Sequence, residues 1–292
     1  MESLKGKVVI VTGSTSGIGA ACAVSFAKYG SKVVITGRNT KRMDDVRKDC
    51  LNAGAPEQHL LTIKGNLSES KCINEIIDLT IEKFGSLDVI VHSAGYSVEA
   101  RPKNVTRENL REVFRIHLTC GYELVQRALP HLKKTKGTIV FIGSMIGIYP
   151  IESATPYCTT KRAEDQLAKL MAAELAPHGI RVNSIIPAWV KTNILQSSGV
   201  TLGSWLDVLT WRLLASLHPM KRCGKPEEIA EYTAFVASDC QRHVTGKSFH
   251  ADGGSDMTSS ISYDATQRML ETFLERTKSV FNWIGRLFWL RN

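Results

Sequence analysis

The sequence has little that would indicate secretion or insertion into a membrane. No apolar run approaches the length of a membrane-spanning helix, and Met1–Lys7 is too charged to resemble the start of a secretory signal. None of the seven cysteines lies in a CxxC pair, and their number is odd, so we expect reduced thiols rather than a disulfide framework. These absences favour a cytoplasmic protein.

Signals of other protein classes are also missing. The eight histidines show neither i,i+4 pairing nor a cysteine partner at zinc spacing, so we expect no metal site. Without a Pro/Gly/Ser-rich linker or an internal repeat, we expect one domain over residues 1–259, followed by a tail at 260–292. The net charge of +9 favours anionic ligands, but the basic residues are dispersed, and we expect no nucleic-acid binding.

Short apolar runs alternate with longer segments of helical period along the chain. The runs are nearly continuous in Val and Ile, as parallel strands covered on both faces require. The expected strands are Val8–Val11, Val33–Ile35, Leu60–Ile63, Val89–Val91, Thr138–Ile142, Val182–Ile186 and Ser248–Ala251, and the clearest helices are Ala20–Tyr29, Ile73–Phe84 and Ala163–Ala176. The pattern predicts a doubly wound, Rossmann-like α/β fold: a mostly parallel seven-stranded sheet with helices on both faces.

A glycine-rich segment connects the first expected strand to the first helix. Its residues are Thr12, Gly13, Ser14, Thr15, Ser16, Gly17, Ile18 and Gly19. Glycines let the backbone turn tightly and approach a pyrophosphate, whose charge is stabilised by free N–H groups at a helix N-terminus. The position favours a dinucleotide cradle over an ordinary structural turn.

The end of the second expected strand bears on the choice of dinucleotide. A 2′-hydroxyl is usually bound by an Asp or Glu, whereas a 2′-phosphate needs a cation. Here Gly37 leaves room and Arg38 supplies a planar fork for phosphate, with no acid before Asp44. The pattern predicts NADP(H) rather than NAD(H); the alternative is that Arg38 is a solvated charge at a strand end.

Tyr157 and Lys161 are four residues apart, which places both on one face of a helix. A neighbouring ammonium favours the phenolate and lowers the tyrosine pKa from its usual value near 10. Ser144, after the fifth expected strand, can hold a carbonyl oxygen beside the phenol. Because YxxxK occurs by chance in many helices, its significance depends on the other motifs.

Taken in order, the motifs resemble those of the short-chain dehydrogenase/reductase family, in its ordinary single-domain, 3-oxoacyl-reductase-like branch. The resemblance covers about residues 5–257 and includes TGxxxGIG at 12–19, HSAG at 92–95, YxxxK at 157–161 and PAWVKT at 187–192. It implies hydride transfer between a nicotinamide and a carbonyl or alcohol. Tyr157 would pass the proton and Ser144 would orient the substrate oxygen. Lys161 would bind the nicotinamide ribose and lower the tyrosine pKa.

The resemblance also implies cofactor contacts and an assembly. Besides Tyr157 and Lys161, the expected contacts are Gly13, Ser14, Thr15, Ser16, Gly17, Ile18, Gly19, Arg38, Asn39, Asn66, Leu67, Ser93, Ala94, Gly95, Pro187, Val190 and Thr192. Thr192 would touch the carboxamide. Family members commonly form dimers or tetramers through two long helices, here about Glu108–Leu132 and Tyr157–Pro177, so we expect a homodimer or homotetramer.

Several residues depart from the family pattern. His117 replaces the asparagine of the family's proton relay, His92 and Ser93 replace both asparagines of NNAG, and Asn66 replaces an aspartate. His117 either holds a relay water and titrates near pH 6 to 7, or is a helix histidine bonded to backbone, with the relay broken. The departures leave two hypotheses: a carbonyl reductase, or a catalytically weakened NADP(H)-binding sensor or scaffold.

The segment at about 188–226 is where the family covers its substrate. It is rich in apolar residues and carries five basic side chains against one acid. Such a wall suits a hydrophobic ketone or aldehyde or its alcohol, such as a steroid, retinoid, keto-lipid or xenobiotic. The candidate substrate contacts are Ser144, Ile146, Trp189, Ile194, Leu195 and Trp205. The alternative is that these residues only pack the segment onto the core or onto another subunit.

The tail at 260–292 extends beyond the family pattern. Apolar residues follow one helical stripe, interrupted by basic residues that preclude spanning a bilayer, and Trp283 and Trp289 lie within it. We expect an amphipathic helical extension. It packs on a partner subunit, covers the active site, or lies in a membrane surface as a peripheral contact.

Overall fold

The computed structural model describes residues 1–98, 104–152, 154–192 and 204–257, although the side chains of 204–207 and 209 are not among the described parts. The chain divides into two units, one of Met1–Thr201 with Gly224–Asp252 and one of Leu202–Cys223 with Gly253–Asn292. The tail at 260–292 lies outside the described residues. The domain boundary expected after residue 259 therefore stays a prediction.

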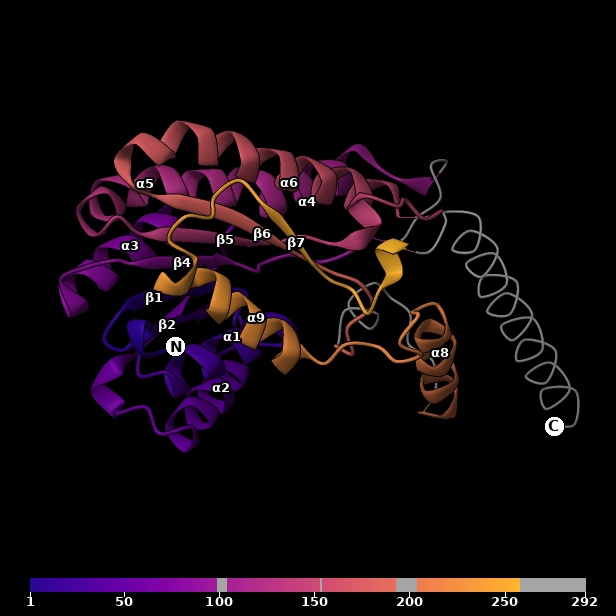
Figure 1. Cartoon of the computed structure of the whole chain (residues 1–292), viewed down its shortest axis with the longest axis horizontal. Helices are drawn as coiled ribbons and strands as arrows, with labels where there is room; N and C mark the ends of the chain where they lie inside the picture. The colour runs from indigo at the N-terminus through magenta and orange to yellow at the C-terminus, as the bar shows by residue number, and fades with distance from the viewer. Residues whose placement is uncertain (99–103, 153, 193–203, 258–292) are drawn as a thin grey trace, which may run out of the picture. The chain divides into compact units, whose positions relative to one another are not determined.

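A single parallel sheet of seven strands forms the centre of the first unit (Figure 1), in the order β3-β2-β1-β4-β5-β6-β7. The strands are β1 (Val8–Thr12), β2 (Lys32–Gly37), β3 (Leu60–Lys64), β4 (Val89–His92), β5 (Thr138–Ile142), β6 (Arg181–Pro187) and β7 (Ser248–Ala251). The strand order reverses between β1 and β4, and the carboxyl ends of strands at such a reversal are where open α/β sheets bind their ligands. The predicted fold class is confirmed, and every strand pair is parallel.

Helices cover both faces of this sheet (Figure 1). One face is covered by α3 (Ser70–Phe84), α5 (Cys120–Thr135) and α6 (Thr155–Leu175), and the other by α1 (Gly17–Lys28), α2 (Thr40–Asn52) and α9 (Pro226–Ala237). Among the described residues, the first unit has one further α-helix, α4 (Arg107–Phe114), and α8 (Ser204–Ser216) belongs to the second unit. None of the described helices is long and apolar enough to cross a membrane.

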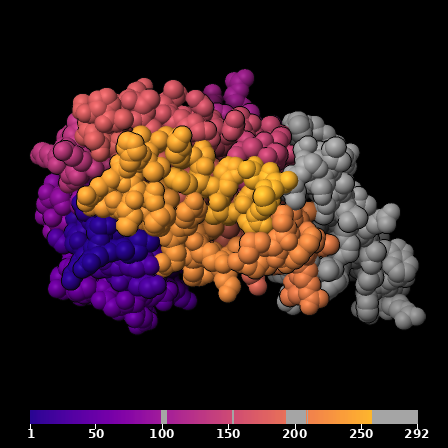
Figure 2. All heavy atoms as spheres, viewed as in Figure 1, coloured from indigo at the N-terminus to yellow at the C-terminus, as the bar shows by residue number. Residues whose placement is uncertain are grey.

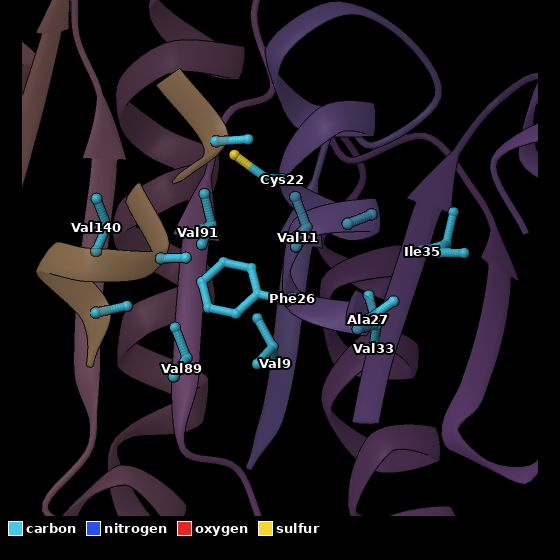
Figure 3. Close-up of a cluster of buried hydrophobic side chains, with 14 of the residues drawn as sticks. Val9, Val11, Cys22, Phe26, Ala27, Val33, Ile35, Val89, Val91 and Val140 are labelled. Atoms are coloured by element: carbon cyan, nitrogen blue, oxygen red, sulfur yellow. The ribbon is translucent and has the colours of Figure 1, made fainter. Parts of the chain in front are cut away.

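The strands bury apolar side chains on both faces. Val9 and Val11 point to the layer of α1, α2 and α9, whereas Val8 and Ile10 point to the layer of α3, α5 and α6. Figure 3 shows the Phe26 ring of α1 lying among the valines of β1 and β4. This two-sided burial explains the nearly continuous Val and Ile runs of the sequence.

Helix boundaries differ from the predicted ones where the chain enters the site. The first helix begins at Gly17 and α6 at Thr155, both earlier than their apolar periodicity indicates. The segment expected as one helix at Glu108–Leu132 comprises α4, a π-helical turn at Arg115–Thr119 and α5. A π-turn adds one residue to the helical repeat, which apolar spacing does not reveal.

The N-terminal segment is held against the layer that contains α9. Figure 2 shows the first residues, in indigo, beside orange residues from the other end of the unit. The backbone N–H of Asp239 donates to Ser3 Oγ at 3.2 Å, and Ser31 Oγ donates to the carbonyl of Leu4 at 2.8 Å. These bonds join segments that are far apart in sequence.

We predict that Phe26→Ala lowers the free energy of unfolding by about 3 to 5 kcal/mol, because the buried ring leaves a cavity between sheet and helix. The matched control is Phe235→Ala, whose ring is 40% exposed and whose loss costs about 1 kcal/mol. Urea unfolding of both variants provides the measurement. Equal losses at the two positions would contradict this view of the core.

Candidate active site

Three sequence-predicted residues meet at the carboxyl end of β5. Ser144 follows that strand, while Tyr157 and Lys161 lie on the first turns of α6. The Ser144 hydroxyl forms a hydrogen bond with the Tyr157 phenol, and Lys161 Nζ lies 5.8 Å from the centroid of the phenol ring. The structure therefore brings together a hydroxyl donor, a phenol and an ammonium.

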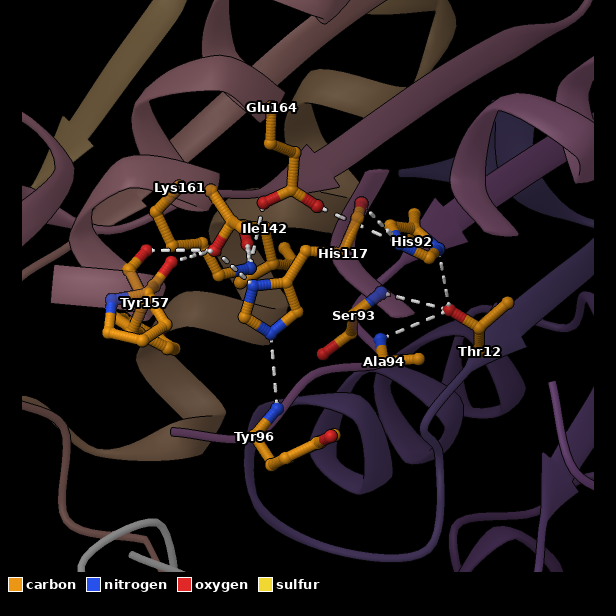
Figure 4. A network of polar contacts seen from close by, with 12 residues as sticks. Thr12, His92, Ser93, Ala94, Tyr96, His117, Ile142, Tyr157, Lys161 and Glu164 are labelled. Carbon is orange, nitrogen blue, oxygen red and sulfur yellow. Dashed lines mark hydrogen bonds and ion pairs between the residues drawn. The ribbon is translucent and has the colours of Figure 1, made fainter. Parts of the chain in front are cut away.

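The Lys161 ammonium is held from inside the fold. It donates to the carbonyl of Ile142 at 2.8 Å and to Glu164 Oε2 at 2.7 Å (Figure 4). Lys161 is 5% exposed and Glu164 is fully buried. Sequence reasoning missed Glu164, although its spacing of three from Lys161 places both on one helix face. An acid beside a lysine in a helix that faces the sheet is the signal that identifies it.

Burial dominates the titration of Tyr157. Removal from water raises the pKa of the phenol, the Lys161 ammonium lowers it, the Glu164 carboxylate raises it, and the bond from Ser144 lowers it. The resulting pKa lies above the usual value for tyrosine. The predicted effect of the ammonium is present, but burial and Glu164 outweigh it. At neutral pH the phenol keeps its proton, as a general acid requires.

His117, on the π-helical turn, is buried beside Tyr157, with ring centroids 5.3 Å apart. The Tyr96 backbone N–H donates to Nε2 at 3.2 Å, so Nδ1 carries the ring proton toward Thr160 Oγ1 at 2.8 Å (Figure 4). Burial and the Lys161 charge hold the pKa of His117 well below 6.5. This geometry matches the backbone-bonded alternative and does not support a titration near pH 6 to 7.

His92, at the end of β4, is also neutral. Thr12 Oγ1 accepts the N–H groups of Ser93 and Ala94 at 3.1 Å each, so its own proton points to His92 Nδ1, also at 3.1 Å. His92 Nε2 then carries the ring proton and donates to the His117 carbonyl at 3.2 Å. Burial and Lys161 lower the pKa of His92 to about 4. The histidine joins the ends of β1 and β4 to the π-helical turn.

Two glycines define a cradle at the switch between β1 and β4. Gly13 has a φ of +65°, and a Cβ there would lie 2.7 Å from the Ala94 Cα. Gly17 has a φ of +55°, and its Cβ would lie 3.2 Å from Thr192 Cγ2. Three separate segments thus meet around the N-terminus of α1. The tight turns at Gly13 and Gly17 fit the pyrophosphate of a dinucleotide, because free N–H groups at a helix N-terminus favour negative charge.

Several expected cofactor residues use their side chains within the fold. Ser14 Oγ accepts the Thr36 N–H at 2.8 Å, Asn39 Oδ1 accepts the Arg42 N–H at 3.0 Å, and Asn66 Oδ1 accepts the Ser68 N–H at 3.2 Å. These bonds shape the turns around the cradle. Their backbone groups remain the candidate contacts at these positions.

The other expected cofactor and substrate residues differ in how exposed they are and in where they lie in the fold. Arg38 is exposed after β2, Thr15, Ser16, Ile18, Ser93 and Thr192 are half-buried, and Leu67 is buried. Gly19 lies in the first turn of α1, Gly95 packs on His117, Pro187 ends β6, and Val190 pairs with Gly224. Of the substrate candidates, Ile146 and Trp189 are half-buried. Ile194, Leu195 and the Trp205 side chain lie outside the described parts of the chain.

The fold and the glycine cradle together define a dinucleotide-binding oxidoreductase. A family model described as enoyl-(acyl carrier protein) reductase matches residues 13–256. The chain belongs to the short-chain dehydrogenase/reductase family of NAD(P)-dependent oxidoreductases. In the part of the chain that the structure describes, no group of three or more His, Cys, Asp or Glu side chains could hold a metal ion.

The chain is similar to curated proteins over most of its length. It is 32% identical to an uncharacterized oxidoreductase of Methylorubrum extorquens, with 87% of this chain and 99% of that protein covered. It is 30% identical to 3-oxoacyl-[acyl-carrier-protein] reductase of Thermotoga maritima, covering 86% and 98%. A solved short-chain dehydrogenase/reductase of unknown function from Caenorhabditis elegans, with cofactor, superposes with a TM-score of 0.84 at 29% identity, covering 90% and 100%.

We predict that Gly13→Ala lowers the free energy of unfolding by about 3 kcal/mol, because it combines a left-handed backbone with overlap at Ala94. Gly85→Ala is the control, since Gly85 has a φ of +75° but open space around it, and there we expect a loss of about 1 kcal/mol. Thermal unfolding of the two variants separates the cost of the left-handed backbone, which both share, from the cost of the overlap with Ala94, which only Gly13→Ala has. A Gly13→Ala loss no larger than the control would exclude the close backbone approach.

Proposed function

We propose that this protein is an NADP(H)-dependent carbonyl reductase, or in reverse a dehydrogenase, of hydrophobic ketones or aldehydes and their secondary alcohols. The observation that carries the proposal is the meeting of Ser144, Tyr157 and Lys161 beside the glycine cradle. Similar proteins include an L-fucose dehydrogenase of Mus musculus and a tropinone reductase-like protein of Erythroxylum coca, at 31% and 33% identity. Their names support chemistry at a carbonyl or an alcohol.

The site residues divide the chemical work. The substrate oxygen accepts hydrogen bonds from the Ser144 and Tyr157 hydroxyls, which polarise the carbonyl. When bound, the nicotinamide supplies or accepts the hydride. In reduction, the Tyr157 phenol gives its proton to the oxygen as that oxygen becomes an alcohol, and the neighbouring Lys161 ammonium stabilises the phenolate left behind. In oxidation, the phenolate takes the alcohol proton.

Arg38 supports NADP(H) as the cofactor. It is exposed at the carboxyl end of β2, and the following residues through Arg42 include no acid that would repel a 2′-phosphate. Burial and the Glu112 carboxylate raise the pKa of Tyr96 to about 12, and the positive charge of Arg38 opposes this rise.

A hydrophobic substrate is supported by the apolar composition of the segment at about 188–226, of which Trp189 is half-buried. The second candidate function is a weakened NADP(H)-binding sensor or scaffold of the same fold. It is favoured by His92 and His117, whose ring nitrogens are bonded within the fold rather than directed to a substrate. Cofactor binding without turnover that depends on Tyr157 would support this candidate.

Exposed apolar side chains on α5 and α6 support a homodimer or homotetramer. Tyr122 is 48% exposed and Leu170 is 52% exposed, so each presents a large apolar surface to a second copy. Light scattering after size-exclusion chromatography measures the assembly. A cytoplasmic location and peripheral membrane contact through the tail at 260–292 belong to the same proposal, and partition of full-length and tail-deleted protein into vesicles tests the contact.

We predict that Tyr157→Phe lowers turnover of lipophilic carbonyls by about 10³-fold, because it removes the transferable proton. Cofactor affinity stays within about twofold, because the phenol ring is retained. NADPH oxidation against a panel of lipophilic and small polar ketones, with fluorescence titration of NADPH, measures both effects. Unchanged turnover would reject the acid/base role, and preference for small polar ketones would reject the substrate class.

We predict that Arg38→Asp lowers the preference for NADPH over NADH by about 100-fold, because a charge-assisted bond to phosphate is replaced by repulsion. Lys48→Asp makes the same charge change at an exposed position on α2 and leaves the preference within about twofold. The ratio of kcat/KM values for the two cofactors is the readout. Full NADPH preference in Arg38→Asp would show that this arginine is only a solvated surface charge.

A further inference from the structure

A buried acid lies directly behind the proposed catalytic lysine. Glu164 is one turn of α6 beyond Lys161, and its side chain is fully buried. We propose that Glu164 is a positioning residue for the reaction: its pairing with the Lys161 ammonium fixes where that ammonium lies and how strongly it stabilises the Tyr157 phenolate. The inference rests on the acid/base role of Tyr157 proposed above.

The geometry shows how Glu164 sets the place of the ammonium. Lys161 Nζ donates to Glu164 Oε2 at 2.7 Å and to the Ile142 carbonyl at 2.8 Å. An ammonium has three donors, so these two bonds orient the third. A lysine has four rotatable side-chain bonds, and anchoring its end at two points removes most of that freedom before a ligand arrives.

The groups that face Glu164 leave Lys161 as its source of positive charge. From β4, His92 Nε2 lies 3.7 Å from Glu164 Oε1, but its proton is directed to the His117 carbonyl at 3.2 Å. Both histidines are neutral, because burial lowers their pKa values. On α6 the other neighbours are the protonated Tyr157 and the carboxylate of Asp165.

The charge of the Asp165 carboxylate is compensated by partners other than Lys161. Its carboxylate accepts from Lys169 Nζ at 2.8 Å and from the Ser248 hydroxyl at 2.5 Å. The carboxylates of Glu164 and Asp165 are therefore both buried on α6, but only Glu164 pairs with Lys161. The neighbouring acid provides a matched comparison.

An ion pair acts on the phenol more weakly than an isolated ammonium. The opposite charges of Lys161 and Glu164 partly cancel at the Tyr157 oxygen, because the Lys161 charge lowers the pKa of Tyr157 and the Glu164 charge raises it. Burial raises the pKa of Glu164 to about 7, against the lowering effect of Lys161. Above that pH Glu164 is ionised, and its charge keeps the pKa of Tyr157 high. Reduction, which needs the protonated phenol, therefore continues to more alkaline pH than Lys161 alone would allow.

The test uses Glu164→Gln, which keeps the length and an oxygen acceptor but removes the charge. Alcohol oxidation needs the phenolate, so its rate falls on the acid side as Tyr157 takes up a proton. We expect this acid limb of the kcat/KM profile to move to lower pH by about one unit in Glu164→Gln, because the ammonium is no longer neutralised. An acid limb that stays in place or moves to higher pH would overturn the proposal.

Asp165→Asn is the matched control, because it removes a buried carboxylate from the next residue without touching Lys161. We expect its acid limb to move by less than about one third of a unit. A shift as large as that of Glu164→Gln would mean that any buried charge on α6 has this effect, and the specific role of Glu164 would be rejected. Thermal unfolding of both variants shows whether they are folded at the assay temperature.

A measurement on the native residue covers the case in which Glu164→Gln does not fold. The phenolate absorbance of Tyr157, taken as wild type minus Tyr157→Phe, gives its titration without a substrate. We expect the pKa of Tyr157 in the cofactor-free enzyme to lie above the usual value for tyrosine. A midpoint well below that value would show an unneutralised lysine and overturn the proposal.

These readouts separate the inference from the proposed function. If Tyr157→Phe retains full turnover, the acid/base assignment fails whatever Glu164 does. If turnover depends on Tyr157 but the acid limb lies at the same pH in Glu164→Gln and in the wild type, only the role of Glu164 fails. The absorbance titration can reject the role of Glu164 without any assay of activity, while Glu164→Gln separates its charge from the effect of burial.

Discussion

Parallel strand pairing is the constraint on which the rest of this structure depends. Because successive strands run in the same direction, each connection must return across a face of the sheet, and all carboxyl ends gather at one edge. The order of strands reverses between β1 and β4, so the helices that follow these two strands, α1 and α5, cover opposite faces of the sheet. Residues as far apart in the chain as Thr12 and Thr192 therefore lie at the same edge of the sheet.

Because the strand ends lie at one edge of the sheet, several polar side chains are buried close to one another there. Thr12, His92, His117 and Lys161 are all buried, so each hydrogen atom must have a defined acceptor. Backbone donors decide the tautomers of both histidines, and burial together with the Lys161 charge keeps both rings neutral. Among these four residues, Lys161 carries the positive charge. Its neighbour Glu164 controls how much of that charge the phenol experiences.

Local patterns in the sequence were sufficient for most of the fold. Short apolar runs predicted all seven strands to within two residues at each end. The glycine-rich segment does connect β1 to α1, but its last three residues already form the first turn of α1. Helix starts were less accurate, because Gly17 and Thr155 begin helices on backbone geometry rather than on apolar spacing. The π-helical turn around His117 has no periodic signature in the sequence. Motif order located Ser144, Tyr157 and Lys161, but not the acid behind them.

The sequence by itself determined which chemical groups this protein carries and the order in which the strands deliver them. It determined the parallel sheet, because two-sided burial requires uninterrupted apolar strands. The tertiary structure alone decided the states of those groups, because burial and long-range partners set protonation. A helix spacing of three allows Lys161 and Glu164 to meet, but only their joint burial behind β5 makes the pair strong enough to influence Tyr157.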